Sequence, residues 1–174
     1  MRAVLLAGLL LALATTAVAQ AVDAWKPFAP EGAAIAFETP TALLLDREEA
    51  ATEANGFSGM RGFAGASPEG GLFLYADTGF PRAALADRTT DQVVLDLVIP
   101  NVVGQFRIKS QRDLSVPGAA GREFLLDKDG VPLRLHIVVR SPWIYTYGVM
   151  ARPGRESDLQ SPSAERFLGS MRLL

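Results

Sequence analysis

The strongest constraint on the fold is the dipeptide Asp129-Gly130, which separates two strongly apolar stretches of the chain. Asp-Gly is typical of a two-residue type I′ hairpin turn, because both central residues of that turn need a positive φ. A turn at these two residues pairs Lys128 with Val131, and the remaining register follows by counting outward. Most apolar side chains of the two strands then share one face: Phe124, Leu126, Leu133, Leu135 and Ile137.

The same register places Glu123 across from His136 on the opposite face. For the next hairpin, the sequence is compatible with a two-residue loop at Ser141-Pro142 or with a three-residue loop. The shorter loop places Tyr147 opposite His136, whereas the longer loop reverses the faces of the following strand. In both cases one face carries aromatic side chains and the other carries aliphatic ones, so neither face is fully exposed to water.

The hairpin belongs to a longer run of predicted β-strands. In the C-terminal half, strands are predicted over residues 106–116, 122–126, 133–139 and 143–150. In the N-terminal half, they are predicted over residues 34–38, 41–46 and 72–76. Residues 46–51 are more typical of a helix turn or a polar loop, and the glycines among residues 57–63 argue against a strand there.

Two helices complete the predicted elements. The apolar spacing of residues 89–103 predicts a helix, with Thr89 as its N-cap and Gln92 in the capping-box position. Pro100 lacks an amide proton and is expected to end or kink this helix near Ile99. A short closing helix is predicted over residues 164–170. These patterns predict an α+β fold, in which helices flank both faces of an antiparallel β-sheet to form an α/β/α sandwich.

The N-terminus has the pattern of a secretory signal peptide over residues 1–19. Arg2 is its only charge, residues 3–14 form a short apolar run, and Ala17-Val18-Ala19 supplies the small residues of a cleavage site. Cleavage after Ala21 also fits the small-residue pattern. Residues 20–174 are then expected to form a single α+β domain that is periplasmic or secreted.

The composition excludes several classes of function. The chain has no cysteine and one histidine, which rules out disulfides, thiolate chemistry and the ligand spacing of typical zinc sites. A formal net charge of −2 without a basic block argues against nucleic acid as a partner. No second apolar stretch is long enough to insert into a membrane once the signal is removed. No cofactor is expected, since the glycines of residues 56–71 match neither a dinucleotide fingerprint nor a P-loop.

From Trp25 onward, the order of these features resembles PsbP-like domains, a family of α/β/α sandwiches that includes PsbP and the Ran-binding import factor Mog. The resemblance is carried by IAFETP at 35–40, PGAAGREF at 117–124, RLHIVVRSPWIYTY at 134–147 and RFLGSMRL at 166–173. Because the family shares a fold and no catalytic constellation, the resemblance implies a binding or assembly module and names no ligand.

Two candidate sites follow from the predicted strands. Glu123 and His136 form a polar cluster that Tyr147 could extend, although an ordinary polar cross-strand pair is the favoured interpretation. The second candidate is a partner-binding surface made of aromatic and arginine side chains: Trp143, Tyr145, Tyr147, Arg134 and Arg140. For its aromatic side chains, burial under a helix is the favoured interpretation.

The sequence therefore predicts an exported, non-catalytic binding or assembly-factor domain. Its partner would be an unidentified protein or small ligand. The alternative hypothesis is a periplasmic hydrolase-type enzyme that uses His136 and Glu123.

Export can be tested by expressing the full chain in a bacterial host and measuring the intact mass of the periplasmic product. We expect a mature N-terminus at Gln20, or at Val22 if the second site is used. Replacing both Ala19 and Ala21 with arginine should block processing, because signal cleavage needs small residues there. A full-length periplasmic product from the unaltered chain would contradict the prediction.

Overall fold

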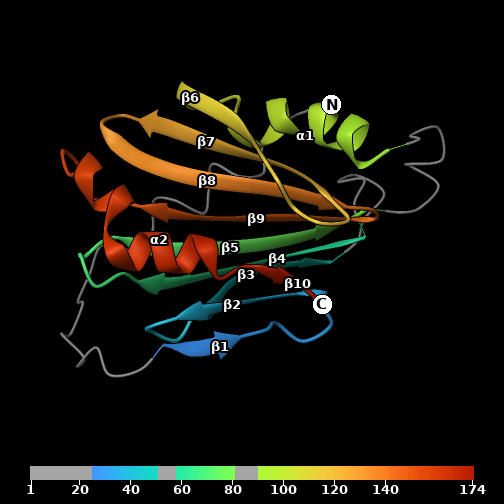
Figure 1. Cartoon of the computed structure of the whole chain (residues 1–174), viewed down its shortest axis with the longest axis horizontal. Helices are drawn as coiled ribbons and strands as arrows, with labels where there is room; N and C mark the ends of the chain where they lie inside the picture. Colours follow the sequence, from blue (N-terminus) through green and yellow to red (C-terminus); the bar gives the residue numbers. More distant parts are fainter. Residues whose placement is uncertain (1–24, 51–57, 81–89) are drawn as a thin grey trace.

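The computed structural model describes residues 25–50, 58–80 and 90–174, and the predicted signal peptide lies outside these ranges. The first five strands are β1 (Lys26–Phe28), β2 (Ile35–Thr39), β3 (Leu44–Ala50), β4 (Gly59–Ala66) and β5 (Leu72–Gly79). The other five are β6 (Arg107–Leu114), β7 (Ala120–Lys128), β8 (Val131–Arg140), β9 (Trp143–Met150) and β10 (Arg172–Leu173). The helices are α1 (Asp91–Val103), the 3₁₀ helix η3 (Glu156–Gln160) and α2 (Pro162–Gly169) (Figure 1).

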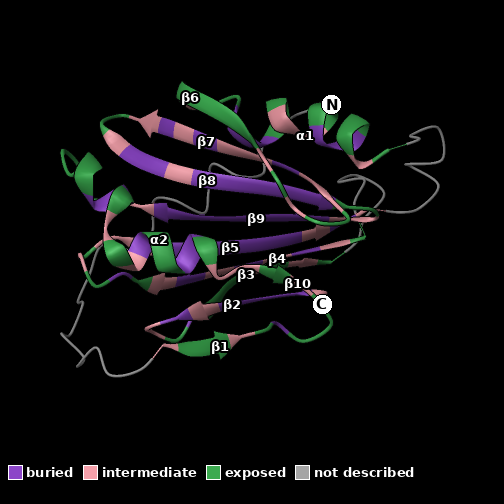
Figure 2. Ribbon diagram, in the orientation of Figure 1, coloured by how far each residue is buried: buried purple, intermediate pink, exposed green. Residues whose placement is uncertain are grey.

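The described strands form two antiparallel sheets. The larger sheet has seven strands in the order β3-β4-β5-β9-β8-β7-β6, and the smaller has three in the order β1-β2-β10. Strand β9 lies in the middle of the larger sheet and is buried along almost its whole length (Figure 2). The predicted antiparallel sheet is therefore confirmed, with β3 and β6 as its two edges.

The predicted hairpin register is confirmed residue by residue. Lys128 pairs with Val131 and Glu123 pairs with His136, as counting outward from the turn requires. Asp129 has a φ of 54° and Gly130 a φ of 81°, as a type I′ turn needs. The following hairpin has the two-residue loop, because Arg140 pairs with Trp143.

Each face of the seven-stranded sheet contributes to its own apolar cluster. On one face, Phe124 and Ile137 of the sheet join a cluster with Val94, Leu95 and Val103 of α1. This cluster is mainly aliphatic.

The cluster on the other face is rich in aromatic rings. Tyr75, Tyr145 and Tyr147 of the sheet join Phe37 of β2 and Phe167 of α2. The ring centroids of Phe37 and Phe167 lie 5.2 Å apart at a steep angle, an arrangement that aromatic pairs favour. We call this side of the large sheet the aromatic face.

The structure contains more strand than the sequence predicts. The layer against the aromatic face includes β2 as well as α2, so that layer is not purely helical. Residues 46–50 are part of β3 instead of a helix turn or loop. Residues 59–66 form β4 despite their glycines. At Gly65 a side chain would not fit, because a Cβ there would lie 2.8 Å from the carbonyl oxygen of Ala42.

Helix α1 also differs from its prediction. Its N-cap is Thr90, whose hydroxyl accepts a hydrogen bond from the Val93 amide at 3.3 Å, whereas Thr89 lies outside the described residues. The helix continues past Pro100 to Val103, the last residue of the predicted range 89–103, so Pro100 does not end it near Ile99. Burial of Val102 and Val103 offsets the one backbone hydrogen bond that proline removes.

The turn can be tested with a pair of glycine substitutions. A Cβ at Gly130 or at Gly169 would meet no atom within 4 Å, so neither change creates a steric clash. Gly130→Ala should lower the free energy of unfolding by about 1 kcal/mol, because alanine is disfavoured at positive φ. Gly169→Ala, in α2, should leave stability unchanged or raise it slightly. Urea unfolding measures both, and equal effects would contradict the turn argument.

Candidate functional site

The register of the sheet places four polar side chains side by side on the aromatic face. Arg112 on β6 pairs with Glu123 on β7, Glu123 pairs with His136 on β8, and His136 pairs with Tyr147 on β9. Cross-strand neighbours on one face have Cβ atoms close enough for direct contact. We call these four residues the polar row.

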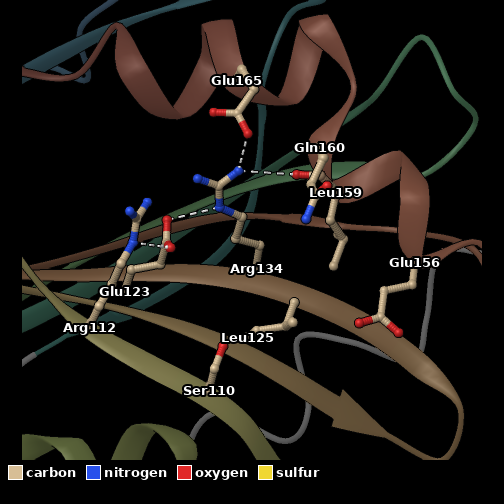
Figure 3. A pocket seen from close by; sticks show the side chains of 9 residues that line it. All are labelled: Ser110, Arg112, Glu123, Leu125, Arg134, Glu156, Leu159, Gln160 and Glu165. Carbon is tan, nitrogen blue, oxygen red and sulfur yellow. Dashed lines mark hydrogen bonds and ion pairs between the residues drawn. The ribbon is translucent and has the colours of Figure 1, made fainter.

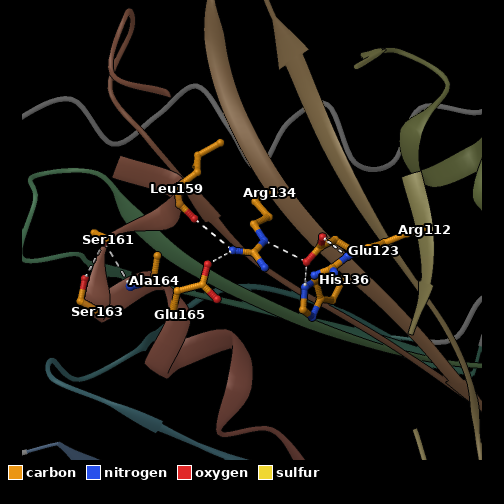
Figure 4. A network of polar contacts seen from close by, with 9 residues as sticks. All are labelled: Arg112, Glu123, Arg134, His136, Leu159, Ser161, Ser163, Ala164 and Glu165. Carbon is orange, nitrogen blue, oxygen red and sulfur yellow. Dashed lines mark hydrogen bonds and ion pairs between the residues drawn. The ribbon is translucent and has the colours of Figure 1, made fainter. Parts of the chain in front are cut away.

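Hydrogen bonds connect the whole polar row. Glu123 Oε1 accepts from Arg112 Nε at 2.6 Å, and Glu123 Oε2 lies 2.7 Å from His136 Nε2. His136 Nδ1 in turn lies 3.1 Å from the hydroxyl oxygen of Tyr147. Arg134, on the same face of β8, donates from Nε to Glu123 Oε2 at 2.8 Å (Figure 4). Glu123 is thus held by three side chains from two neighbouring strands.

These contacts hold the pKa of Glu123 well below its usual range. The hydrogen bond with His136 is the largest cause, and together with those from Arg112 and Arg134 it outweighs the opposing effect of burial. Burial raises the pKa of the Tyr147 hydroxyl above its ordinary value, and the charge of Glu123 raises it further. At neutral pH the row therefore contains a fixed carboxylate and a neutral phenol.

Arg134 connects the sheet to the elements packed against it. Its Nη1 donates to the carbonyl oxygen of Leu159 in η3 at 3.3 Å and also contacts the carboxylate of Glu165 in α2. The Arg134 side chain is only 13% exposed, while that of Glu165 is 54% exposed. The ion pair with Glu123 and the one with Glu165 together hold the pKa of Arg134 above its ordinary value despite desolvation.

A groove of about 490 Å³ opens beside this network. Residues of β6, β7 and β8 form one side of it, and η3 and α2 form the other (Figure 3). Its lining combines charged, polar and apolar side chains: Ser110, Arg112, Glu123, Leu125, Arg134, Glu156, Leu159, Gln160 and Glu165. The groove is therefore a mixed polar surface in which Glu123 and Arg134 already have defined positions.

The predicted polar cluster of Glu123 and His136 forms, and Tyr147 and Arg134 join it. His136 is only 6% exposed and does not line the groove, because it lies between Glu123 and Tyr147. The groove thus combines Glu123 with the Ser110 hydroxyl but leaves out the imidazole.

The second predicted set does not form an exposed aromatic surface. Tyr145 and Tyr147 are each 1% exposed and belong to the core under β2 and α2, so their rings cannot contact a partner. Trp143 is partly buried against the same cluster. Arg140 donates to the carbonyl oxygen of Leu174 at 2.9 Å and lies apart from Arg134.

Several residues that complete the groove were not predicted from the sequence. Arg112 and Ser110 could not be placed because the connection between Leu114 and Gly121 contains no two-residue turn that would fix the register of β6 against β7. Gln160 and Glu165 reach the groove only because η3 and α2 fold back over the sheet. The one available signal was the charge of Arg112 within a predicted strand.

Two further results concern metals and membranes. Within residues 25–50, 58–80 and 90–174, no cluster of three or more histidine, aspartate or glutamate side chains is placed to hold a metal ion, including Asp46, Glu48 and Glu49. No helix of the described chain has the length and apolar character needed to cross a bilayer.

Comparisons with known proteins bear on the fold. No family model and no curated protein matches the chain. The solution structure of cyanobacterial PsbP (CyanoP) from Synechocystis sp. PCC 6803 is similar, with a TM-score of 0.54 over 93% of this chain and 99% of that chain. The chain has a PsbP-like fold. The resemblance seen in the sequence is thus confirmed for the fold, while an identity of 11% shows the fold alone.

A second similar structure is that of PA94 from Pseudomonas aeruginosa, a protein of unknown function. It has a TM-score of 0.41 and 14% identity, and the match covers 78% of this chain and 88% of the PA94 chain.

The electrostatics of the polar row can be tested with Glu123→Gln. We expect the free energy of unfolding to fall by about 2 kcal/mol near neutral pH, because the hydrogen bonds of Glu123 to charged partners are weakened. The folded-state pKa of Glu123 lies below its unfolded value of about 4.3. Its contribution is therefore complete above that value and is lost as the pH falls toward the folded-state pKa.

Urea unfolding between neutral pH and about pH 3 measures this loss. Glu165→Gln is the control, since its exposed ion pair should contribute less than about 1 kcal/mol. A stability difference between wild type and Glu123→Gln that stays constant or grows as the pH falls would contradict the assigned role of Glu123.

Proposed function

We propose that this PsbP-like chain is a non-catalytic binding or assembly-factor domain that binds a protein partner or small ligand in the groove beside the polar row. The observation that supports the proposal best is the fixed position of Glu123 and Arg134 at the groove. Three side chains hold Glu123, and three groups from β7, η3 and α2 hold Arg134. Side chains that are already ordered lose little conformational entropy when a ligand binds.

The covering layers favour this location over the rest of the sheet. We propose that helices contribute to both of them, α1 over the aliphatic face and α2, together with the small sheet, over the aromatic face. Apolar side chains of the sheet lie in the two clusters that these layers help to form. The groove is where the polar side chains of β6, β7 and β8 meet η3 and α2, so a ligand there needs no rearrangement of the core.

A hydrolase that uses His136 and Glu123 has weaker support. His136 is buried between Glu123 and Tyr147, so a substrate in the groove would not reach the imidazole. The low pKa of Glu123 also makes it a poor proton donor and a weak base near neutral pH. Both properties suit a structural and positioning role for the polar row.

The proposed location of the protein rests on the sequence of residues 1–19. We propose that export delivers the chain to the periplasm or the exterior. The absence of cysteine is compatible with that environment, because the fold does not depend on disulfide formation.

The groove can be tested by filling it. Ser110 lines the groove, whereas Gln111, the next residue on β6, pairs with Phe124 of the aliphatic face. Ser110→Trp should block binding, while Gln111→Trp adds the same ring on the opposite face of the same edge strand. Tagged wild-type and variant proteins would be incubated with periplasmic extract, and their bound proteins and small molecules identified by mass spectrometry.

We expect at least one molecule that wild type and Gln111→Trp recover and that Ser110→Trp loses. Unfolding midpoints of the three proteins would show that the variants are folded. Identical recovery by all three proteins would contradict a binding role for the groove.

A further inference from the structure

We propose that the ligand of the groove carries a carboxylate group, which binds to Arg112 and Arg134 in place of the carboxylate of Glu165. This inference rests on the proposed binding function of the groove and specifies the chemistry that the groove recognises. It follows from the hydrogen bonds that the two arginines make and from those that they leave open.

Arg112 presents an oriented guanidinium group to the groove. Its Nε donates to Glu123 Oε1 at 2.6 Å, which limits the rotation of the side chain. Among the described residues, its Nη1 and Nη2 groups have no hydrogen-bond partner, and the side chain is 66% exposed. A guanidinium group with two open donors matches the two oxygens of a carboxylate, a geometry that arginine favours.

Arg134 already binds a carboxylate that a ligand can replace. Its Nη1 contacts Glu165, which projects from the surface of α2 toward the groove (Figure 3). Because the Glu165 side chain is 54% exposed, solvent screens this ion pair and the carboxylate can move into water at little cost. Glu123, in contrast, is 13% exposed and is held by three side chains, so it stays in place.

The charges of the groove favour a carboxylate over other ionic ligands. Lys109 pairs with Glu156, so the remaining charges are Arg112 and Arg134 against Glu123 and Glu165. Exchange of Glu165 for one ligand carboxylate preserves this balance. A doubly charged phosphate would add repulsion from the neighbouring carboxylates. A metal cation would need carboxylate oxygens that arginine and lysine side chains already occupy.

The rest of the lining suits the group that bears the carboxylate. Leu125 and Leu159 offer apolar contacts, and Ser110 and Gln160 offer hydrogen bonds. This combination suits a short aliphatic acid or the side chain of a glutamate. The carboxylate could therefore belong to a free acid or to an acidic residue of a protein partner, and the two sources differ in what else contacts the groove.

The test measures binding of two carboxylate probes by isothermal titration calorimetry with the processed chain. The probes are butyrate and a short Gly/Ser peptide with capped termini and one central glutamate, and the control peptide has glutamine in its place. We expect saturable binding of a carboxylate probe and none of the glutamine peptide. Tighter binding of the peptide than of butyrate identifies a protein source, and the reverse order identifies a free acid.

Three variants locate the binding. Arg112→Gln should weaken binding about tenfold or more, because it removes charge-assisted hydrogen bonds. Arg107→Gln should have no effect, since Arg107 lies on the same strand with a 71% exposed side chain but does not line the groove. Glu165→Gln should tighten binding several-fold, because a neutral amide competes less well for Arg134. A merely structural role of Glu165 would not produce that gain.

The inference is overturned if no carboxylate probe binds at millimolar concentration, if the glutamine peptide binds equally well, or if Arg107→Gln and Arg112→Gln weaken binding alike. It is also overturned if Glu165→Gln fails to tighten binding. These failures are distinct from failure of the groove itself. If Ser110→Trp abolishes recovery of a natural ligand while the probes fail, the groove binds a ligand without a carboxylate.

Discussion

The register of the seven-stranded sheet is the constraint on which the rest of the structure depends. Successive side chains of a strand point to opposite faces, so a slip of one residue would exchange the two faces of a whole strand. A slip of β8 against β7 would separate His136 from Glu123 and move Arg134 away from the groove. The two tight hairpins hold this alignment in the folded chain, because each closes on a two-residue loop, at Asp129-Gly130 and at Ser141-Pro142.

The same register explains why the polar row lies toward the β6 edge of the sheet. One line of paired residues crosses all seven strands of the aromatic face: Leu45, Phe63, Tyr75, Tyr147, His136, Glu123 and Arg112. The rings in the middle pack under β2 and α2, and Arg112 at the β6 edge is exposed. His136 and Glu123 lie between the buried rings and the exposed edge. The imidazole can be buried there because Glu123 and Tyr147 are hydrogen-bond partners for both of its nitrogens.

Predictions based on local patterns succeeded where a short loop set the geometry. The pairing of Glu123 with His136 followed from counting outward from a turn, and β9 has the bounds predicted for it. Residues 59–66 were missed as a strand because glycine is locally disfavoured in strands, whereas the absence of a side chain at Gly65 allows close approach to Ala42. The sequence left open whether Pro100 ends or kinks α1, and the helix continues to Val103 because burial of that residue outweighs a local preference.

The sequence by itself determined the hairpin at Asp129-Gly130, its inner face and the contact between Glu123 and His136. All of these follow from turn geometry and the two-residue period of a strand, which act between near neighbours in the chain. Only the tertiary structure decided that Tyr145 is core and that Arg112, Arg134 and Glu165 share a groove. Such contacts join segments far apart in the chain, and they depend on how α2 and η3 pack over the sheet, which no local pattern specifies.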